Sequence, residues 1–322
     1  SRKKHPADFT LWKPSAEGQP SWATGEEAWP SGRPGWHIEC SVMSTSLLGK
    51  HFDVHGGGID NLFPHHENEI AQSEPLCGGH PWVKYWMHPA HLQLVDEASG
   101  EPVKMSKSLG NVIGIPELLE RYSEDLIRWF YASTHYRSTL AFSYRLIDEA
   151  GEGYKKVKRA IKFLEERLLN ASDEALTIPV HTSYASLRVE EGKDVPRERE
   201  SFVYGAYGKA SEHFMQAFIT AMNDDMGTPA ATAAIYEYVN ALFAGGIEHS
   251  EDIPSLLAAY RCLLRHLFVF GIELAHPRLY PELAADSFPR GGDTKSATEP
   301  YEKVIDRLLE LRQVARKDRD FA

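Results

Sequence analysis

The sequence predicts an α/β domain followed by an all-helical bundle domain. In the first part, a short alternating segment at 51–55 runs into three consecutive glycines, and a helical pattern follows from Pro64 to about Ser73. A second short apolar segment at 91–95 completes the order strand, glycine turn, helix and strand, which is typical of α/β organisation. From residue 154 onward, apolar residues recur at helical spacing in one segment after another, which indicates a bundle of helices.

The opening of the chain shows little periodicity before the first expected helix. Residues 1–35 are rich in Trp, Pro and Gly, which favours extended and looped structure. Apolar residues at roughly helical spacing then predict a helix over 36–48. We expect the glycines at 56–58 to supply positive φ in a turn and to let the backbone approach a ligand closely. Pro64 fits the first turn of the next helix, where a backbone N–H is not needed.

Further helices are expected along the second part of the chain. Helices over 116–122 and 124–133 are separated by Ser123, which is a good N-cap for the second of them. The bundle is expected to contain a helix from 154, a helix ending near 224, a helix over 228–243 and a helix over 254–270. Residues 275–298 are rich in Pro and Gly and predict a linker, after which a last helix begins near Pro300.

The composition excludes several classes of protein. The chain has 322 residues, of which 42% are hydrophobic and 25% are charged, as in ordinary globular proteins. No apolar run reaches membrane-spanning length, so no membrane partner is expected. Three scattered cysteines are too few for a disulfide framework, which indicates a reducing cytoplasm. The net charge of -11 argues against nonspecific nucleic-acid binding over the whole surface, but it leaves room for a local basic patch.

Metal-type ligands gather at the start of the helix expected after Pro64. His65 and Glu69 are four residues apart and His66 and Glu69 are three apart, so either histidine shares a helical face with the carboxylate. Imidazole and carboxylate suit zinc, and a thiolate such as that of Cys40 would complete a tighter site. The same residues could equally form a surface hydrogen-bonding cluster, and a lone cysteine is more often a buried small hydrophobe.

Two strings carry features of nucleotide chemistry. Lys104 and Lys107 flank Ser106 in a segment that reads as a loop, and two ammonium groups there can neutralise charge developing on a departing pyrophosphate. The alternative is a solvated basic turn. Asp60, just beyond the glycine turn, either accepts hydrogen bonds from ribose hydroxyls or caps the helix that follows.

A basic run stands at the start of the helical part of this acidic chain. Its members are Lys155, Lys156, Lys158, Arg159 and Lys162. The run either contacts nucleic-acid phosphates or forms a solvated helix face.

Taken together, these strings resemble the cysteinyl-tRNA synthetase family of class I aminoacyl-tRNA ligases. The matching strings, in the order and spacing of the family, are Gly-Trp-His-Ile-Glu-Cys-Ser at 35–41, His-Gly-Gly-Gly at 55–58, Phe-Pro-His-His-Glu-Asn-Glu-Ile-Ala-Gln-Ser at 63–73, Tyr-Trp-Met-His at 85–88 and Lys-Met-Ser-Lys-Ser at 104–108. Weaker similarity continues at 135–138 and 221–225. The resemblance covers most of the chain and implies part of a Rossmann-like class I catalytic domain followed by a helical bundle.

The resemblance implies an activity and a metal site. The family joins L-cysteine to tRNA(Cys) with ATP, through a cysteinyl-adenylate. Its zinc, held by two cysteines, a histidine and a glutamate, selects the substrate thiolate, and by motif these ligands map to Cys40, His65 and Glu69. The other family cysteine belongs to a segment before this chain.

The resemblance also suggests roles for the remaining candidate residues. Lys104 and Lys107 are the expected catalytic residues. The residues expected to bind ATP, supplied with Mg²⁺, are Lys107, Gly57, Gly58 and Asp60. Trp36 and His55 are expected to line the substrate pocket, although Trp36 is equally well interpreted as a core aromatic. The residues expected to contact tRNA are Lys155, Lys156, Lys158 and Arg159.

The chain departs from the family pattern at its ends. It lacks the H-x-G-H signature, and the string at 88–91 is no substitute because Ala90 stands where glycine belongs. We therefore expect the middle of a longer protein, a cytoplasmic monomer that is inactive as this chain alone. The expected parts are the second half of the catalytic domain at 1–115, a connecting region at 116–153, a tRNA-binding bundle at 154–274, a linker at 275–298 and the start of a truncated C-terminal region at 299–322.

Two alternative functions stay open at this point. One is the cysteine ligase of mycothiol biosynthesis, which shares the zinc and K-M-S-K-S features but joins cysteine to an amino sugar. The string at 68–72 and the long helical region favour the tRNA enzyme over this alternative. The other is a non-catalytic fragment that only binds RNA, which the missing H-x-G-H string suggests.

Overall fold

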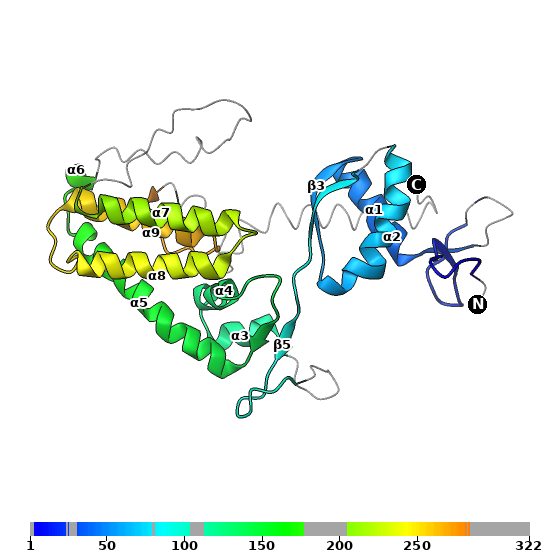
Figure 1. The fold of residues 1–322 in the computed structure, drawn as a ribbon, viewed down its shortest axis with the longest axis horizontal. Coiled ribbons are helices and arrows are strands. Elements are labelled where there is room, and N and C mark those ends of the chain that lie inside the picture. The colour runs from blue at the N-terminus through cyan, green and yellow to red at the C-terminus, as the bar shows by residue number, and fades with distance from the viewer. Residues whose placement is uncertain are drawn as a thin grey trace. The chain divides into compact units, whose positions relative to one another are not determined.

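The computed structural model describes residues 3–23, 25, 31–78, 81–103, 113–176, 205–281 and 283. The chain forms two compact units, with the division between His91 and Leu92 (Figure 1). The Lys-Met-Ser-Lys-Ser string, most of the expected linker and the helix expected near Pro300 lie outside the described residues. No helix in the described part is long and apolar enough to cross a membrane.

The first unit contains a β-α-β arrangement. Strand β3 (Phe52–Gly56) pairs in parallel with β4 (Val83–Met87), with Val54 opposite Tyr85. Two parallel neighbours require a crossover between them, and helix α2 (Glu67–Cys77) lies in that connection. The prediction of a strand, a turn and a helix in this region is confirmed, whereas β4 was not predicted from the sequence.

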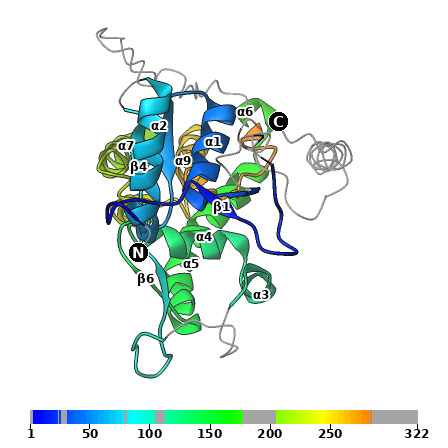
Figure 2. The same cartoon turned by 90° about the vertical axis from the view of Figure 1, so that its right-hand side faces the viewer.

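Helix α1 (Trp36–Leu48) packs against α2, as Figure 2 also shows. It begins directly after Gly35, whose backbone is extended. The antiparallel strands β1 (Trp12–Pro14) and β2 (Gly32–Pro34) precede it in the sequence. The helix therefore has the bounds that the apolar spacing predicted. The two short strands stand in the region that was predicted to be extended and looped.

The glycine turn after β3 differs from the expectation in one respect. None of the glycines at 56–58 has positive φ, so that part of the prediction was wrong. Gly57 is instead required for space, because a Cβ atom there would lie 2.9 Å from both Cε1 and Nε2 of His66. Two short helical turns follow, η1 (Ile59–Asn61) and η2 (Leu62–His66), and η2 continues into α2.

The second unit begins with a small layer of strands and helices. Strand β5 (Leu92–Leu94) pairs in parallel with β6 (Leu140–Phe142), and helices α3 (Ile115–Arg121) and α4 (Glu124–Ala132) lie between them in sequence. Both helices follow the sequence prediction closely. The side chains that form the core of this layer are Leu94, Leu118, Tyr122, Ile127, Phe130, Phe142 and Ile147.

The rest of the second unit is a helical bundle (Figure 1). Its long helices are α5 (Tyr144–Leu169), α7 (Gly208–Asn223), α8 (Thr228–Ala244) and α9 (Ile253–Phe268), with the short elements α6 (Asp173–Leu176) and η5 (Gly205–Tyr207) beside them. Helix α7 packs on α8, and α5 packs on both α8 and α9. Every residue of α9 from Ser255 to Leu264 is buried, which places this helix at the centre of the bundle.

Helix α5 begins at Tyr144, well before the start near residue 154 that the sequence predicted. The side chain of Ser143 caps it by accepting a hydrogen bond from the Leu146 backbone N–H at 3.3 Å. Gly151 lies in the first half of the helix, where a Cβ atom would approach Leu126 to 3.3 Å. A glycine at this buried position interrupts the apolar stripe in the sequence, although the helix continues through it.

Candidate active site

Three side chains of the first unit converge at the contact between α1 and α2. Cys40 lies on α1, His65 at the end of η2 and Glu69 in the first turn of α2. One potential ligand atom from each, a sulfur, a nitrogen and an oxygen, lies within 4.8 Å of the others. Cys40 is half-buried, His65 is buried and Glu69 is 0% exposed. The spacing argument placed His65 beside Glu69, and the packing of α1 on α2 brings Cys40 to them.

The carboxylate of Glu69 is fully buried with one oxygen lacking a partner. Oε2 accepts a hydrogen bond from His55 Nε2 at 3.1 Å and lies 3.6 Å from His65 Nε2. Oε1 has no hydrogen-bond partner among the described residues. A buried carboxylate oxygen without a donor is costly, and a bound cation would satisfy it. Sulfur, imidazole nitrogen and carboxylate oxygen are also the ligands that zinc prefers, so these residues fit a zinc ion.

A second group of possible ligands shares Glu69. His66 Nε2 lies 3.8 Å from Glu69 Oε2, and His55, His66 and Glu69 also offer atoms within 4.8 Å of one another. Both histidines of the His65-His66 pair therefore face the carboxylate, as the spacing of four and three residues indicated. Only the group that contains His65 includes a thiol.

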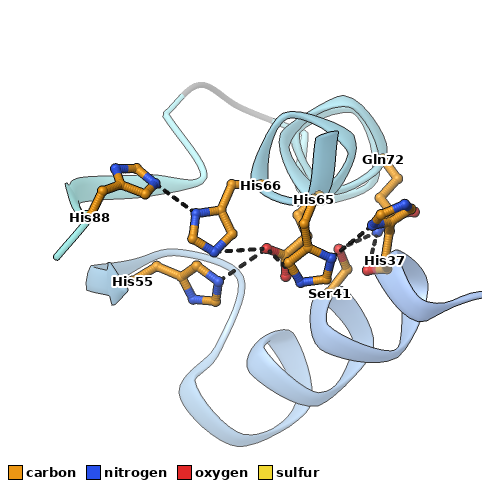
Figure 3. A network of polar contacts seen from close by, with 8 residues as sticks. His37, Ser41, His55, His65, His66, Gln72 and His88 are labelled. Carbon is orange, nitrogen blue, oxygen red and sulfur yellow. Dashed lines mark hydrogen bonds and ion pairs between the residues drawn. The ribbon is translucent and has the colours of Figure 1, made fainter. Parts of the chain in front are cut away.

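Two histidines that the sequence did not single out as site residues, His37 and His88, lie at the two ends of this polar network (Figure 3). His37 Nδ1 lies 2.7 Å from His65 Nδ1, and His66 Nδ1 lies 2.8 Å from His88 Nε2. His37 stands three residues before Cys40 on α1, which places both on one helical face, so this spacing was the available signal for His37. His88 follows β4, and nothing local in the sequence connects it with His66.

Burial dominates the electrostatics of the cluster. It lowers the pKa of His66 to about 4, although the nearby carboxylate of Glu69 acts in the opposite direction. Burial also raises the pKa of the Cys40 thiol, and the carboxylates of Glu69 and Glu39 raise it further. The protein part of the site therefore favours the protonated thiol, and a cation would reverse that preference.

Gln72 fixes α1 against α2 beside the cluster. Its Nε2 atom donates hydrogen bonds to the backbone carbonyl of His37 at 2.5 Å and to Oγ of Ser41 at 2.6 Å (Figure 3). These two acceptors bracket Cys40 on α1. The contact therefore sets the position of Cys40 relative to His65, which lies in the turn before α2, and relative to Glu69, which lies on α2.

The residues expected to line the substrate pocket lie at the same place. Trp36 stacks on His65 and is 55% exposed, so its indole covers the histidine and is not part of a core. His55 projects from β3 and is directed at Glu69. Both residues therefore border the candidate metal ligands directly.

The residues expected to bind ATP are only partly described. Gly57 and Gly58 form the turn after β3, and Asp60 is an exposed residue whose Oδ1 lies 3.9 Å from His91 Nε2. Lys104 and Lys107 lie outside the described residues, so the structure does not relate them to this turn.

Every side chain of the basic run on α5 has a partner within the chain. Lys155 pairs with Glu152 at 2.5 Å, Lys158 with Asp125 at 3.0 Å and Lys162 with Glu166 at 3.7 Å. Lys156 bonds to Asn240, and Arg159 lies 3.9 Å from Glu248. A nucleic acid would therefore compete with these acceptors for the basic side chains.

Comparison with known proteins matches two parts of the chain to known families. Residues 1–152 match the family described as tRNA synthetases class I (C) catalytic domain, and residues 217–274 match the DALR domain family. A cysteine--tRNA ligase of Geotalea daltonii is 37% identical over 99% of this chain and 59% of its own length. One of Alkalilimnicola ehrlichii is 39% identical over 99% of this chain and 56% of its own length.

Among solved structures, the LeuRS in a ternary complex from Agrobacterium radiobacter K84 superposes with a TM-score of 0.48. It is 21% identical, and the match covers 72% of this chain and 27% of that chain.

A class I synthetase catalytic domain that continues into a DALR helical domain defines the class of this protein. The chain belongs to the class I tRNA synthetase class by these two domains, which confirms the predicted combination of an α/β domain and a helical domain. Within that class, the chain belongs to the cysteine--tRNA ligase family. It spans between 56% and 59% of the length of the curated relatives with which it was compared.

Proposed function

We propose that this chain supplies the cysteine-binding part of an enzyme that attaches L-cysteine to tRNA(Cys). In this reaction ATP and cysteine form cysteinyl-adenylate and pyrophosphate, and the cysteinyl group then passes to the 3′-terminal adenosine of the tRNA. The observation that carries the proposal is the convergence of Cys40, His65 and Glu69 within 4.8 Å around a buried, half-satisfied carboxylate. Family membership supplies the class of reaction.

The selectivity of the enzyme would follow from this donor set. Cys40, His65 and Glu69 would hold Zn²⁺, and bound zinc supplies a strong preference for a thiolate over the hydroxyl of serine. Trp36 stacks on His65 at the exposed side and would close the pocket around the cysteine side chain. His55 would border the same pocket from β3.

The adenylate chemistry would use residues close to the turn after β3 and on the Lys-Met-Ser-Lys-Ser string. Gly57, Gly58 and Asp60 would bind ATP, which is delivered with Mg²⁺. Lys107, and less directly Lys104, would stabilise the negative charge that develops on pyrophosphate as it leaves. The DALR domain and the basic run on α5 would contact the tRNA. Free thiols at Cys40, Cys77 and Cys262 agree with a cytoplasmic location. We propose that the enzyme acts there as a monomer.

The first test uses the full-length protein that carries this chain. We expect cysteine-dependent exchange of pyrophosphate into ATP, and transfer of cysteine to tRNA(Cys) with no transfer to an amino sugar acceptor. Cys40→Ala and Glu69→Ala should lose or weaken bound zinc in metal analysis, whereas Cys77→Ala should retain it, since Cys77 packs near Trp82 and Val83. Equal zinc content in all three variants would refute the assignment of Cys40 and Glu69 as zinc ligands. Transfer of cysteine to the amino sugar would instead establish the alternative ligase activity.

The second test concerns Lys107. Lys107→Ala should lower the kcat of cysteine-dependent pyrophosphate exchange by roughly a hundredfold or more, the size expected for one preorganised charge that acts in the transition state. A change confined to the KM for ATP, with kcat preserved, would instead assign the lysine to ground-state binding.

A further inference from the structure

We propose that His37 and His55 are positioning residues for the zinc ligands: His37 fixes the tautomer of His65, and His55 fixes the carboxylate of Glu69. Neither histidine binds the metal in this arrangement. The inference rests on the proposed zinc site, and it extends that site by two residues that contact the ligands. Three contacts carry it: one between two imidazoles, one between an imidazole and a carboxylate, and one from a glutamine to the backbone of α1.

The contact between His37 and His65 selects which nitrogen of His65 faces the metal. Their Nδ1 atoms are 2.7 Å apart, so one ring donates a hydrogen and the other accepts it. If His65 donates through Nδ1–H, its Nε2 carries a lone pair, and this atom is the one that lies 3.6 Å from Glu69 Oε2. If His65 accepted instead, its neutral ring would carry hydrogen on Nε2, which cannot then bind a metal. Metal binding by His65 through Nε2 therefore requires His37 Nδ1 as the acceptor.

The ring of His37 is held in place for this contact. Its backbone carbonyl accepts a hydrogen bond from Gln72 at 2.5 Å, which fixes the first turn of α1 on α2. Its imidazole stacks on Trp36 with ring centroids 5.5 Å apart and meets the edge of Phe9 at 5.6 Å. The acceptor is therefore preorganised by neighbours that are not candidate metal ligands.

The contact between His55 and Glu69 selects which oxygen of the carboxylate stays available. His55 Nε2 donates to Oε2 at 3.1 Å, whereas the buried Oε1 has no hydrogen-bond partner among the described residues. His55 is itself packed against Phe52 and Trp86, with ring centroids 5.8 and 5.0 Å away. One oxygen is thus occupied by a rigidly held donor, and the other remains for a cation. Loss of an outer partner of this kind typically weakens metal binding by about 10- to 100-fold.

A competing interpretation makes His55 itself a ligand, together with His66 and Glu69, since these three also converge. Two features favour the positioning role. The distance from His55 Nε2 to Glu69 Oε2 is that of an ordinary hydrogen bond, and the group with His55 and His66 contains no thiol. The two interpretations differ in what a variant of His55 does to the number of bound ions, so metal stoichiometry separates them.

The experiment measures zinc affinity by competition with a chromophoric chelator, together with metal stoichiometry, on the full-length protein. His37→Phe keeps an aromatic ring between Trp36 and Phe9 but removes the acceptor, whereas His37→Asn keeps a polar atom close to the position of Nδ1. His55→Phe and His55→Gln form the matching pair for the donor to Glu69. His51→Phe is the control, because His51 is exposed in the same unit and its Nδ1 donates to the Pro81 carbonyl at 3.0 Å, not to a candidate ligand.

We expect both Phe variants to retain one zinc site with affinity about 10- to 100-fold weaker, and the Asn and Gln variants to recover much of the loss. The control should bind zinc like the parent. In cobalt-substituted protein, the thiolate-to-cobalt absorption from Cys40 should persist in all four variants. Far-UV circular dichroism should show unchanged helix content in each.

The outcomes are distinguishable from failure of the proposed site. Unchanged affinity in both Phe variants, with zinc lost in Cys40→Ala, would overturn the positioning role and leave the zinc site standing. Loss of stoichiometric zinc in His55→Phe, as complete as in Cys40→Ala, would make His55 a ligand and also overturn it. Undiminished zinc in Cys40→Ala would overturn the site on which the inference rests.

Discussion

The indole of Trp36 lies nearly flat on the imidazole of His65, with ring centroids 4.2 Å apart and planes inclined by 22°. Trp36 is the first residue of α1 and His65 belongs to the turn before α2, so the stack joins the starts of the two segments that carry the candidate ligands. One face of the indole is directed at a candidate ligand, and 55% of the residue remains exposed. An aromatic side chain in this place both restrains the imidazole and offers an apolar wall to a small substrate.

This stack predicts a role in substrate binding. Trp36→Ala should raise the KM for cysteine in pyrophosphate exchange by about two- to tenfold, since a stacked aromatic contact contributes roughly 0.5 to 1.5 kcal/mol. Trp36→Phe should lie close to the parent because it retains a ring over His65. The thermal stability of both should change little, because the side chain is largely exposed. An unaltered KM in Trp36→Ala would exclude the indole from the pocket wall.

The glycine turn makes a second prediction, which rests on space. In Gly57→Ala the new methyl group would lie 2.9 Å from His66, whose ring is held by His88 at 2.8 Å, so the histidine must move. We expect a loss of about 1 to 3 kcal/mol in the free energy of unfolding, which is typical of overpacking at a tight site. Gly56→Ala is the matched control, since its nearest neighbour would be the Met87 carbonyl at 3.4 Å. Differential scanning calorimetry compares the two, and equal melting temperatures would contradict the steric argument.

The difference between prediction and structure at this turn has a simple cause. A run of three glycines indicates that backbone freedom or space is required, but the sequence does not say which. The need for space at Gly57 arises from His66, nine residues further on in the sequence and at the end of η2. That requirement becomes visible only when the helix is placed against the turn.

Elements defined by local pattern were predictable, and elements defined by distant pairing were not. The bounds of α1 follow from apolar spacing, and α8 (Thr228–Ala244) lies within one residue of the expected 228–243, with a proline in its first turn. Strand β4 is only five residues long and exists because it pairs with β3, which precedes it by a whole helix. The early start of α5 was hidden for a different reason, since Gly151 occupies a buried position that an apolar side chain would have marked.

The same distinction applies to the candidate site. His65 and Glu69 share one helical face, so their proximity was predictable from a spacing of four. The contact of His37 with His65 joins residues 28 apart in sequence and depends on the packing of α1 against α2. Propensity and spacing carry no information about such a contact, although the i, i+3 relation of His37 to Cys40 was available in the sequence as a sign of a shared face.

The buried histidine of α9 makes a prediction about pH. His266 lies against Phe214 and Phe218 and donates through Nδ1–H to the Cys262 carbonyl at 2.7 Å. Burial lowers its pKa from 6.5 to about 4, so the unfolded chain takes up a proton near pH 6.5 and the folded chain does so only near pH 4. Its contribution to stability is complete above pH 6.5 and is lost as the pH falls toward 4, by about 3 kcal/mol over that window.

Urea denaturation across this pH range tests the assignment. In His266→Gln the free energy of unfolding should be lower at pH 7.5, because a buried contact is altered, but its decline between pH 6.5 and 4 should be shallower than in the parent. His213→Gln, at an exposed position of α7, should keep the slope of the parent. Identical slopes in the parent and His266→Gln would show that His266 titrates alike in the folded and unfolded chains.

The basic run on α5 makes the last prediction, and the ion pairs of the structure determine which residues to change. Lys158 bonds at 3.0 Å to Asp125, whose carboxylate is only 14% exposed, so its removal would leave a poorly solvated charge and lower stability. Lys155 and Lys162 are 70% and 76% exposed, and their partners Glu152 and Glu166 are also well exposed. Such surface pairs contribute little to folding, so these two lysines can be replaced with little structural consequence.

The double variant Lys155→Ala/Lys162→Ala of the full-length protein should therefore bind tRNA(Cys) more weakly while folding normally. If each lysine contacts a phosphate, the slope of log affinity against log salt should flatten by about one unit per contact. Adenylate formation without tRNA should be unchanged, because α5 contains none of the residues proposed to bind ATP or cysteine. The control is Lys50→Ala/Lys209→Ala, which removes the same charge at exposed positions outside α5 and should keep the salt slope of the parent. Equal salt slopes in the two double variants would mean that the basic run is a solvated helix face. Its side chains would then pair only with carboxylates of the chain itself.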